Sequence, residues 1–288
     1  MQLKLTNLIN TLSICFNNKI TKRGNIVLPL LVILLFAFSA NAQMNVSGKP
    51  GLLFVPSAVE SKPGSFIFGL AYNPVDYSFR RNGYNSENTY FINLTILPRL
   101  DINLNLMRMN GELRKQDKGI GDRQLDIKYL ILREKKYQPS MAILVSAPFG
   151  IDNSFTTNAL VLTKTLSLSP KFTAEVTAGI GSPYYFQRDD SEKSNSNIFG
   201  NLELKNKKDL KYRYLSGPIG GIKLGYNKKG GLMVEWDSQH LNIGAYGTLF
   251  KKWTIQAGVL DFSQITFGTS YALNLKTLPK RLKKANEN

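Results

Sequence analysis

The sequence predicts an all-β protein, an antiparallel up-and-down transmembrane β-barrel of about twelve strands that follows a cleaved signal peptide. Three observations support this fold class. Apolar residues alternate with polar ones along most of the 288-residue chain, the connections between strands tend to alternate in length, and the N-terminus resembles an export signal.

The alternation is clearest in the last stretch before the C-terminal tail. Successive side chains of a strand point to opposite faces, so a repeat of two residues predicts a strand with one apolar face. One face here carries Ile265, Phe267, Thr269, Tyr271, Leu273 and Leu275, and the other carries Thr266, Gly268, Ser270, Ala272 and Asn274.

Twelve segments show this pattern, and an even number brings both ends of a single-chain barrel to one side. The predicted strands are Gly64–Tyr72, Thr89–Leu97, Leu100–Met109, Asp122–Leu132, Ser140–Ala147, Asn158–Leu166, Lys171–Ile180, Gly220–Tyr226, Leu232–Trp236, His240–Phe250, Trp253–Leu260 and Gln264–Leu275.

The polar faces of these strands predict the residues that line the lumen. Because unpaired charge in a barrel interior is costly, the mixture of acids and bases predicts a paired network rather than a hydrolytic pair of carboxylates. The lumen candidates are Arg123, Asp126, Lys128, Glu175, Lys223 and Glu235, with Asp101 as a further acid.

One strand fits the pattern poorly. Lys164 shares a face with Leu160, Leu162 and Leu166. A lysine on the lipid face at mid-bilayer costs about 2–4 kcal/mol. The other face (Ala159, Val161, Thr163 and Thr165) is therefore predicted to meet lipid.

The connections indicate how the barrel lies in the membrane. Short links such as Pro98-Arg99 and Lys251-Lys252 alternate with longer ones, of which 181–219 is the longest, although the links at 237–239 and 261–263 are tight where long ones are expected. Outer-membrane barrels have short periplasmic turns and long outer loops, so both termini are predicted to be periplasmic.

The N-terminus predicts export. Lys19, Lys22 and Arg23 precede an uncharged run over 26–39 that ends in Ala40-Asn41-Ala42. This run is shorter than a membrane-spanning helix needs, so a signal peptide is favoured over a retained anchor. The predicted parts are a signal peptide (1–42), a periplasmic or plug segment (43–63), the barrel (64–275) and a basic periplasmic tail (276–288).

Composition excludes several classes of function. Export would remove Cys15, the single cysteine, and His240 is the single histidine, so neither a disulfide scaffold nor a Cys- or His-rich metal centre is expected. The formal net charge of +17 lies largely in turns and in the tail, which favours contact with anionic lipid over nucleic acid. No metal and no cofactor is predicted.

Several segments carry a family pattern, namely 51–58, with the sequence GLLFVPSA, 121–129 and 133–142, and the pattern extends through 160–164 and 177–181. In these segments the chain resembles the YjbH-type family of exopolysaccharide biosynthesis outer-membrane proteins. It implies an outer-membrane barrel without enzymatic activity or cofactor that assists export or surface assembly of an extracellular polysaccharide. The partners it implies are outer-membrane lipid, the polysaccharide and periplasmic export components.

Three further features leave alternatives open. A small-solute porin is feasible, because twelve strands lie between a filled barrel and an aqueous channel. Ser238 and His240 lie two residues apart, as a barrel lipase or deacylase could use them, although a polar turn is favoured. Aromatic residues in the longest loop are predicted to form an interfacial girdle or to contact glycan, namely Tyr184, Tyr185, Phe186, Tyr212 and Tyr214.

Overall fold

A computed structural model describes residues 43–78, 85–111, 122–147, 156–188, 202–210 and 212–275. The predicted signal peptide (1–42) and basic tail (276–288) lie outside these residues. Within the described part of the chain, no helix is long and apolar enough to cross a membrane.

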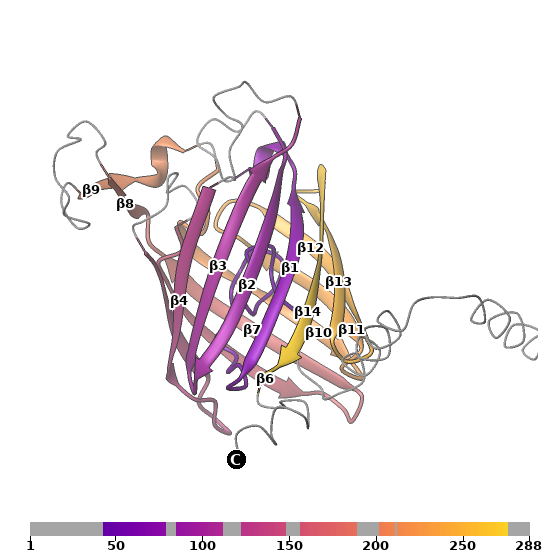
Figure 1. Ribbon diagram of the computed structural model, residues 1–288. Helices are drawn as coiled ribbons and strands as arrows, with labels where there is room; N and C mark the ends of the chain where they lie inside the picture. The colour runs from indigo at the N-terminus through magenta and orange to yellow at the C-terminus, as the bar shows by residue number, and fades with distance from the viewer. Residues whose placement is uncertain are drawn as a thin grey trace, which may run out of the picture. The chain divides into compact units, whose positions relative to one another are not determined.

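Twelve strands form one closed antiparallel barrel, which confirms the predicted fold class (Figure 1). They are β1 (Ser65–Asn73), β2 (Glu87–Leu97), β3 (Leu100–Met109), β4 (Asp122–Leu132), β5 (Ser140–Ser146), β6 (Ala159–Ser167), β7 (Phe172–Gly181), β10 (Gly217–Tyr226), β11 (Gly230–Trp236), β12 (Leu241–Leu249), β13 (Trp253–Leu260) and β14 (Gln264–Asn274).

Each barrel strand pairs with its neighbour in the sequence except at two places. β14 closes the barrel against β1, with Ser65 opposite Asn274, so the two ends of the barrel meet at one rim. β7 pairs directly with β10, because the chain between them forms a separate two-stranded hairpin of β8 (Tyr184–Arg188) and β9 (Leu202–Asn206). In the described connections lie two short 3-10 helices, η1 (Val75–Tyr77) and η4 (Lys207–Asp209).

The predicted alternation of faces holds along the wall. In β4 the outward side chains Ile127, Tyr129 and Ile131 are exposed, whereas Asp126 and Lys128 are buried. Exposed leucine, isoleucine, valine and aromatic side chains continue around the barrel, as expected for a wall whose solvent is lipid. Aromatic pairs join neighbouring strands, for example Tyr72 stacked on Phe267 with ring centroids 5.0 Å apart.

The prediction for the faces of β6 was wrong. Ala159, Val161 and Thr163 are buried in the lumen, and Leu160 and Leu162 face outward. Lys164 shares the outward face, but it lies toward the short-turn end of the strand, where its Nζ is 3.0 Å from the Glu134 carboxylate. The lysine therefore avoids the hydrocarbon by its height on the wall rather than by turning inward.

The strand boundaries agree closely with the predicted ones, and three strands have the predicted bounds without change. The β8–β9 hairpin was not predicted, and it lies inside the predicted loop over 181–219. Its strands have five residues each, too few for a repeat of two to stand out.

The outward face should tolerate charge only near its ends. Ile222→Arg, in the middle of β10, is expected to lower the free energy of unfolding by about 2–4 kcal/mol in lipid vesicles, because the guanidinium must enter hydrocarbon. Lys164→Arg is the control and should leave stability unchanged, since the Glu134 carboxylate is within reach. Equal losses in denaturant titrations of the two variants would contradict the assigned depth.

Candidate functional site

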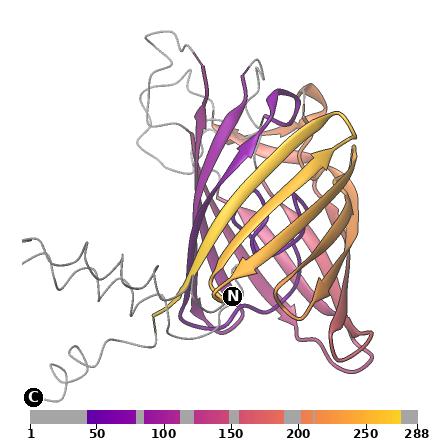
Figure 2. The ribbon, with the colours of Figure 1, turned by 90° about the vertical axis from the view of Figure 1, so that its right-hand side faces the viewer.

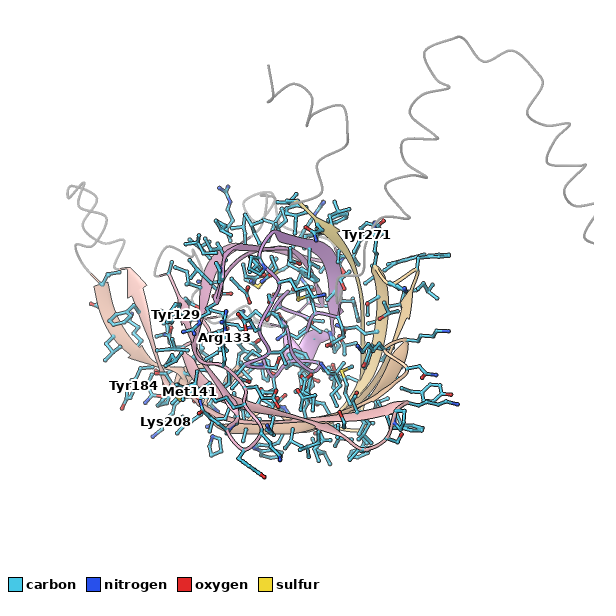
Figure 3. All side chains as sticks on the ribbon, turned by 90° about the horizontal axis from the view of Figure 1, so that it is seen from below. Tyr129, Arg133, Met141, Tyr184, Lys208 and Tyr271 are labelled. Atoms are coloured by element: carbon cyan, nitrogen blue, oxygen red, sulfur yellow. The ribbon has the colours of Figure 1, made fainter. Side chains whose placement is uncertain are left out.

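The N-terminal segment, residues 43–58, occupies the lumen and is called the plug below (Figures 2 and 3). It is folded back on itself, with Gly51 bridged to Pro56 and with the Leu52 N–H donating to the Val55 carbonyl at 2.9 Å. Hydrogen bonds reach the wall on several sides, including Asn103 on β3 and Thr163 on β6. The sequence predicted a periplasmic or plug segment over 43–63, and residues 43–58 of that range lie in the lumen.

Glu235 on β11 holds the tip of the plug. Its carboxylate accepts the backbone N–H groups of Leu53, Phe54 and Val55, at 3.0, 2.8 and 3.1 Å. A further bond of 3.2 Å comes from the Asn242 side chain, and Glu235 itself is 1% exposed. Successive N–H groups that converge on one anion form a backbone nest, and bonds to a charged acceptor are stronger than neutral ones.

Glycines in the wall make room for the two leucines of the tip. A Cβ atom added to Gly258 would lie 2.5 Å from Leu53 Cδ1, and one added to Gly244 would lie 2.8 Å from Leu53 Cδ2. Gly221 has the same relation to Leu52 Cδ2, at 2.7 Å. The inward positions of β10, β12 and β13 therefore form sockets that fit this plug and leave no room for larger side chains.

Ion pairs join the predicted lumen residues to one another and to the plug. Lys49 of the plug lies 2.7 Å from Asp126, and both are fully buried. Lys128 pairs with Asp101 at 3.1 Å, and its ammonium also donates to the Val59 carbonyl at 2.6 Å.

Lys223 and Glu175 form the third pair, at 2.9 Å. The Lys223 ammonium also donates to the side chain of Gln43, at the start of the plug, at 3.2 Å. Arg123 does not join this network, because its side chain is exposed and lies on the opposite face of β4 from Asp126. The other five predicted lumen residues face the lumen.

An aromatic cluster covers the plug. Phe54 packs against Tyr77, Tyr212 and Tyr214, with ring centroids 5.5, 6.1 and 6.4 Å away. Tyr77 comes from η1 and the other two tyrosines from the connection between β9 and β10. The Tyr214 hydroxyl is 3.2 Å from Ser47 Oγ and 3.3 Å from the Phe54 carbonyl oxygen. Loops at the rim opposite the start of β1 and the end of β14 therefore bind the plug directly.

Lys207 in η4 stabilises the loops that form the aromatic cluster. Its ammonium donates to the carbonyl oxygens of Thr156 and Tyr214, at 2.8 and 2.7 Å. Burial, together with repulsion from Lys49, lowers the pKa of Lys207 to about 7. Through its two hydrogen bonds, Lys207 links the loop that carries Thr156 to the loop that carries Tyr214.

The structure divides the predicted aromatic residues into two groups. Tyr212 and Tyr214 are buried in the cluster. They therefore neither form part of an interfacial girdle nor contact a glycan at the surface, and the prediction for these two residues was wrong. Tyr184 and Phe186 are exposed on β8, and Tyr185 between them is buried.

Ser238 and His240 lie in the tight turn between β11 and β12, and their side chains have separate contacts. The Ser238 hydroxyl oxygen accepts the Ser216 N–H at 3.0 Å, and the hydroxyl donates to the Arg213 carbonyl at 3.5 Å. His240 packs on Tyr77, with ring centroids 4.9 Å apart, and its Nδ1 is 3.7 Å from the Asp237 carboxylate, a contact that raises the pKa of His240. This arrangement is that of a polar turn, as favoured from the sequence.

Some residues of this site could not be identified from the sequence. Lys49, Tyr77 and Asn242 were not singled out, because nothing in their local sequence shows that they meet inside the barrel. The role of the glycines could have been predicted from the sequence. Gly244 and Gly258 fall on the lumen side of alternating strands, where larger residues would be expected.

A closed antiparallel barrel with an apolar outer wall and a polar, paired interior defines the class, an outer-membrane β-barrel protein. The chain belongs to the YjbH family of exopolysaccharide biosynthesis proteins, whose model matches residues 43–288. The resemblance seen in the sequence is thereby confirmed.

Two solved structures show a broad likeness of fold. A NanC porin is 9% identical with a TM-score of 0.36, covering 74% of this chain and 99% of its own. An outer membrane channel from Pseudomonas putida F1 is 12% identical with a TM-score of 0.34, covering 76% and 98%. None of the curated protein sequences compared with the chain matches it.

Glu235→Gln is expected to loosen the tip of the plug. The amide keeps the shape of the side chain but loses the charge and turns one acceptor into a donor facing the N–H groups of 53–55. A loss of about 1.5–3 kcal/mol in the free energy of unfolding should accompany faster amide exchange at these residues. Glu134→Gln, in the turn outside the lumen, is the control, and unchanged exchange in Glu235→Gln would refute the role of the nest.

Gly244→Val tests the sockets. The new side chain overlaps Leu53, and such overpacking costs about 1–3 kcal/mol. Gly247→Val on the same strand is the matched control, because no atom lies within 4 Å of the added Cβ. Thermal denaturation should show a loss in the first variant alone, and adding Leu53→Ala should recover part of it. No recovery would mean that the wall, rather than the plug, is strained.

Proposed function

We propose that this protein is a non-enzymatic outer-membrane barrel that assists export or surface assembly of an extracellular polysaccharide. Membership in the YjbH family is the observation that carries the proposal. The paired lumen charges agree with it, since the acids Asp126, Glu175 and Glu235 bind the plug or a neighbouring lysine instead of facing an open groove.

We further propose that the barrel rests in a closed state. The plug fills the lumen and the aromatic cluster lies on it, so a permanently open porin for small solutes is disfavoured. Passage of a polymer through the lumen would require both the plug and the aromatic cluster to move. In this proposal they open when periplasmic export components act on the N-terminal segment.

The proposed orientation has both ends of the barrel at the periplasmic rim. The rim at which β1 begins and β14 ends also carries the short turns at 98–99, 227–229 and 250–252. These turns include Arg99, Lys228, Lys229 and Lys251, which suit contact with anionic head groups or acidic partners, whereas Lys252 is buried.

The role in export predicts a defect that is specific to the surface. A strain lacking the gene should carry less surface polysaccharide while the cytoplasmic sugar-nucleotide precursors and glycan synthesis are kept. Chemical assay of the cell-surface and intracellular glycan fractions gives the readout, and complementation with the wild-type chain is the control. Unchanged surface glycan would eliminate the proposal.

The closed state predicts electrical behaviour. The wild-type barrel in planar bilayers should show no steady current, because the plug and the cluster block the lumen, whereas Glu235→Gln should show intermittent openings as the tip comes loose. Glu134→Gln is again the control. Steady ohmic currents from the wild type would instead favour the small-solute porin.

A further inference from the structure

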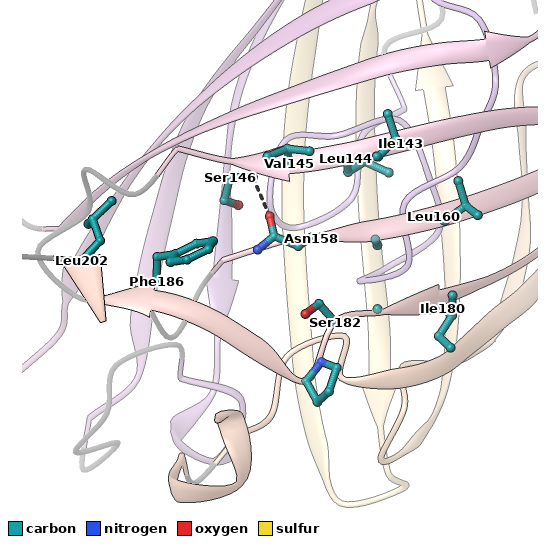
Figure 4. Close-up of a pocket in the computed structure, with 13 residues that line it drawn as sticks. Ile143, Leu144, Val145, Ser146, Asn158, Leu160, Ile180, Ser182, Phe186 and Leu202 are labelled. Carbon is teal, nitrogen blue, oxygen red and sulfur yellow. Dashed lines mark hydrogen bonds between the residues drawn. The ribbon is translucent and has the colours of Figure 1, made fainter. Parts of the chain in front are cut away.

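The outer wall carries an apolar pocket that the lumen site does not use (Figure 4). It has a volume of about 680 Å³ and lies where the β8–β9 hairpin stands away from the barrel. Ile143, Val145, Leu160 and Ile180 line it on the wall side, and Phe186 and Leu202 line it on the hairpin side.

The wall of the pocket belongs to the lipid-facing belt. Its four side chains point outward from β5, β6 and β7, and all four are exposed. Outward side chains of a transmembrane barrel meet lipid tails, so this side of the pocket opens to hydrocarbon rather than to the lumen.

The hairpin presents apolar side chains of its own. β8 and β9 pair with each other, and neither pairs with a strand of the barrel. Phe186 lies opposite Leu204 in this pairing, and both side chains are exposed, as is Tyr184. Such a face is unfavourable in water and favourable against lipid, which gives a second and independent reason to place an apolar ligand here.

The backbone hydrogen bonds between β5 and β6 end before β5 does. β5 pairs with β6 only from Ser140 to Leu144, while β6 pairs with β7 along its full length. Beyond Leu144 the seam is closed by side chains, with the Ser146 N–H donating to Asn158 Oδ1 at 3.0 Å (Figure 4). The pocket lies over this corner.

We propose that the pocket is a binding site for an acyl chain of a membrane lipid. A chain elsewhere on the barrel contacts protein on one side, whereas a chain here contacts the wall and the hairpin together. Burial of more apolar surface slows its exchange with the bulk bilayer. The ligand is an acyl chain because the lining of the pocket is mostly apolar, with Ser146, Asn158 and Ser182 as its polar members.

Photolabelling in a defined bilayer tests the proposal. The full mature barrel is placed in nanodiscs of phosphatidylethanolamine and phosphatidylglycerol that contain a trace of phospholipid with a diazirine in its acyl chain. After irradiation, peptide mass spectrometry should find several-fold more label on peptides that carry Ile143 or Phe186 than on the peptide that carries Ile243. Ile243 is an outward residue of β12 away from the pocket, with the same exposure as Leu160, 39%.

Two pocket variants and one control variant make the result specific. Leu160→Trp fills the pocket and should abolish the excess label, whereas Ile243→Trp adds the same ring elsewhere on the wall and should not. Phe186→Ala removes the hairpin side of the pocket without touching the barrel wall and should also reduce the excess. Equal labelling of the pocket and of β12 in the wild type, or an excess that survives both pocket variants, would overturn the proposal.

Discussion

The contact between Glu235 and the three N–H groups of the plug organises the interior of this barrel. A carboxylate in a closed lumen is costly unless its oxygens are hydrogen-bonded, and a chain tip with free N–H groups has the same need. Each group satisfies the other, because bonds of 2.8–3.1 Å join Glu235 to Leu53, Phe54 and Val55. Neither the charge in the wall nor the folded tip would be stable in a dry lumen without the other.

The size of the barrel explains why a plug is needed. Eight strands are filled by their own side chains, whereas twelve leave space that must hold water, a ligand or more protein. Here residues 43–58 fill this space with protein. The wall has no side chain at Gly221, Gly244 and Gly258, where the leucines of the plug lie. Segments distant in the sequence are thus matched in volume as well as in charge.

The barrel was predictable because each strand carries its own signal. Alternation placed β3, β4 and β13 with the observed bounds and put Asp126, Lys128 and Glu235 inside. It could not show that Lys49 would pair with Asp126, since the plug is irregular and its contacts are set by the closed fold. Lys164 was misjudged because the cost of a charge depends on its depth, which one strand does not reveal.

The hydrogen bonds that hold the tip of the plug at Glu235 are of a size that another molecule can overcome. A hydrogen bond to a charged group contributes about 1.5–3 kcal/mol, so the nest at Glu235 contributes several kcal/mol. Water that enters as the plug leaves would solvate Glu235 and recover part of this energy. A partner that binds with micromolar affinity supplies about 8 kcal/mol, which is comparable to that remaining cost. A second component that binds the N-terminal segment can therefore release the tip of the plug, which is one step that the proposed opening requires.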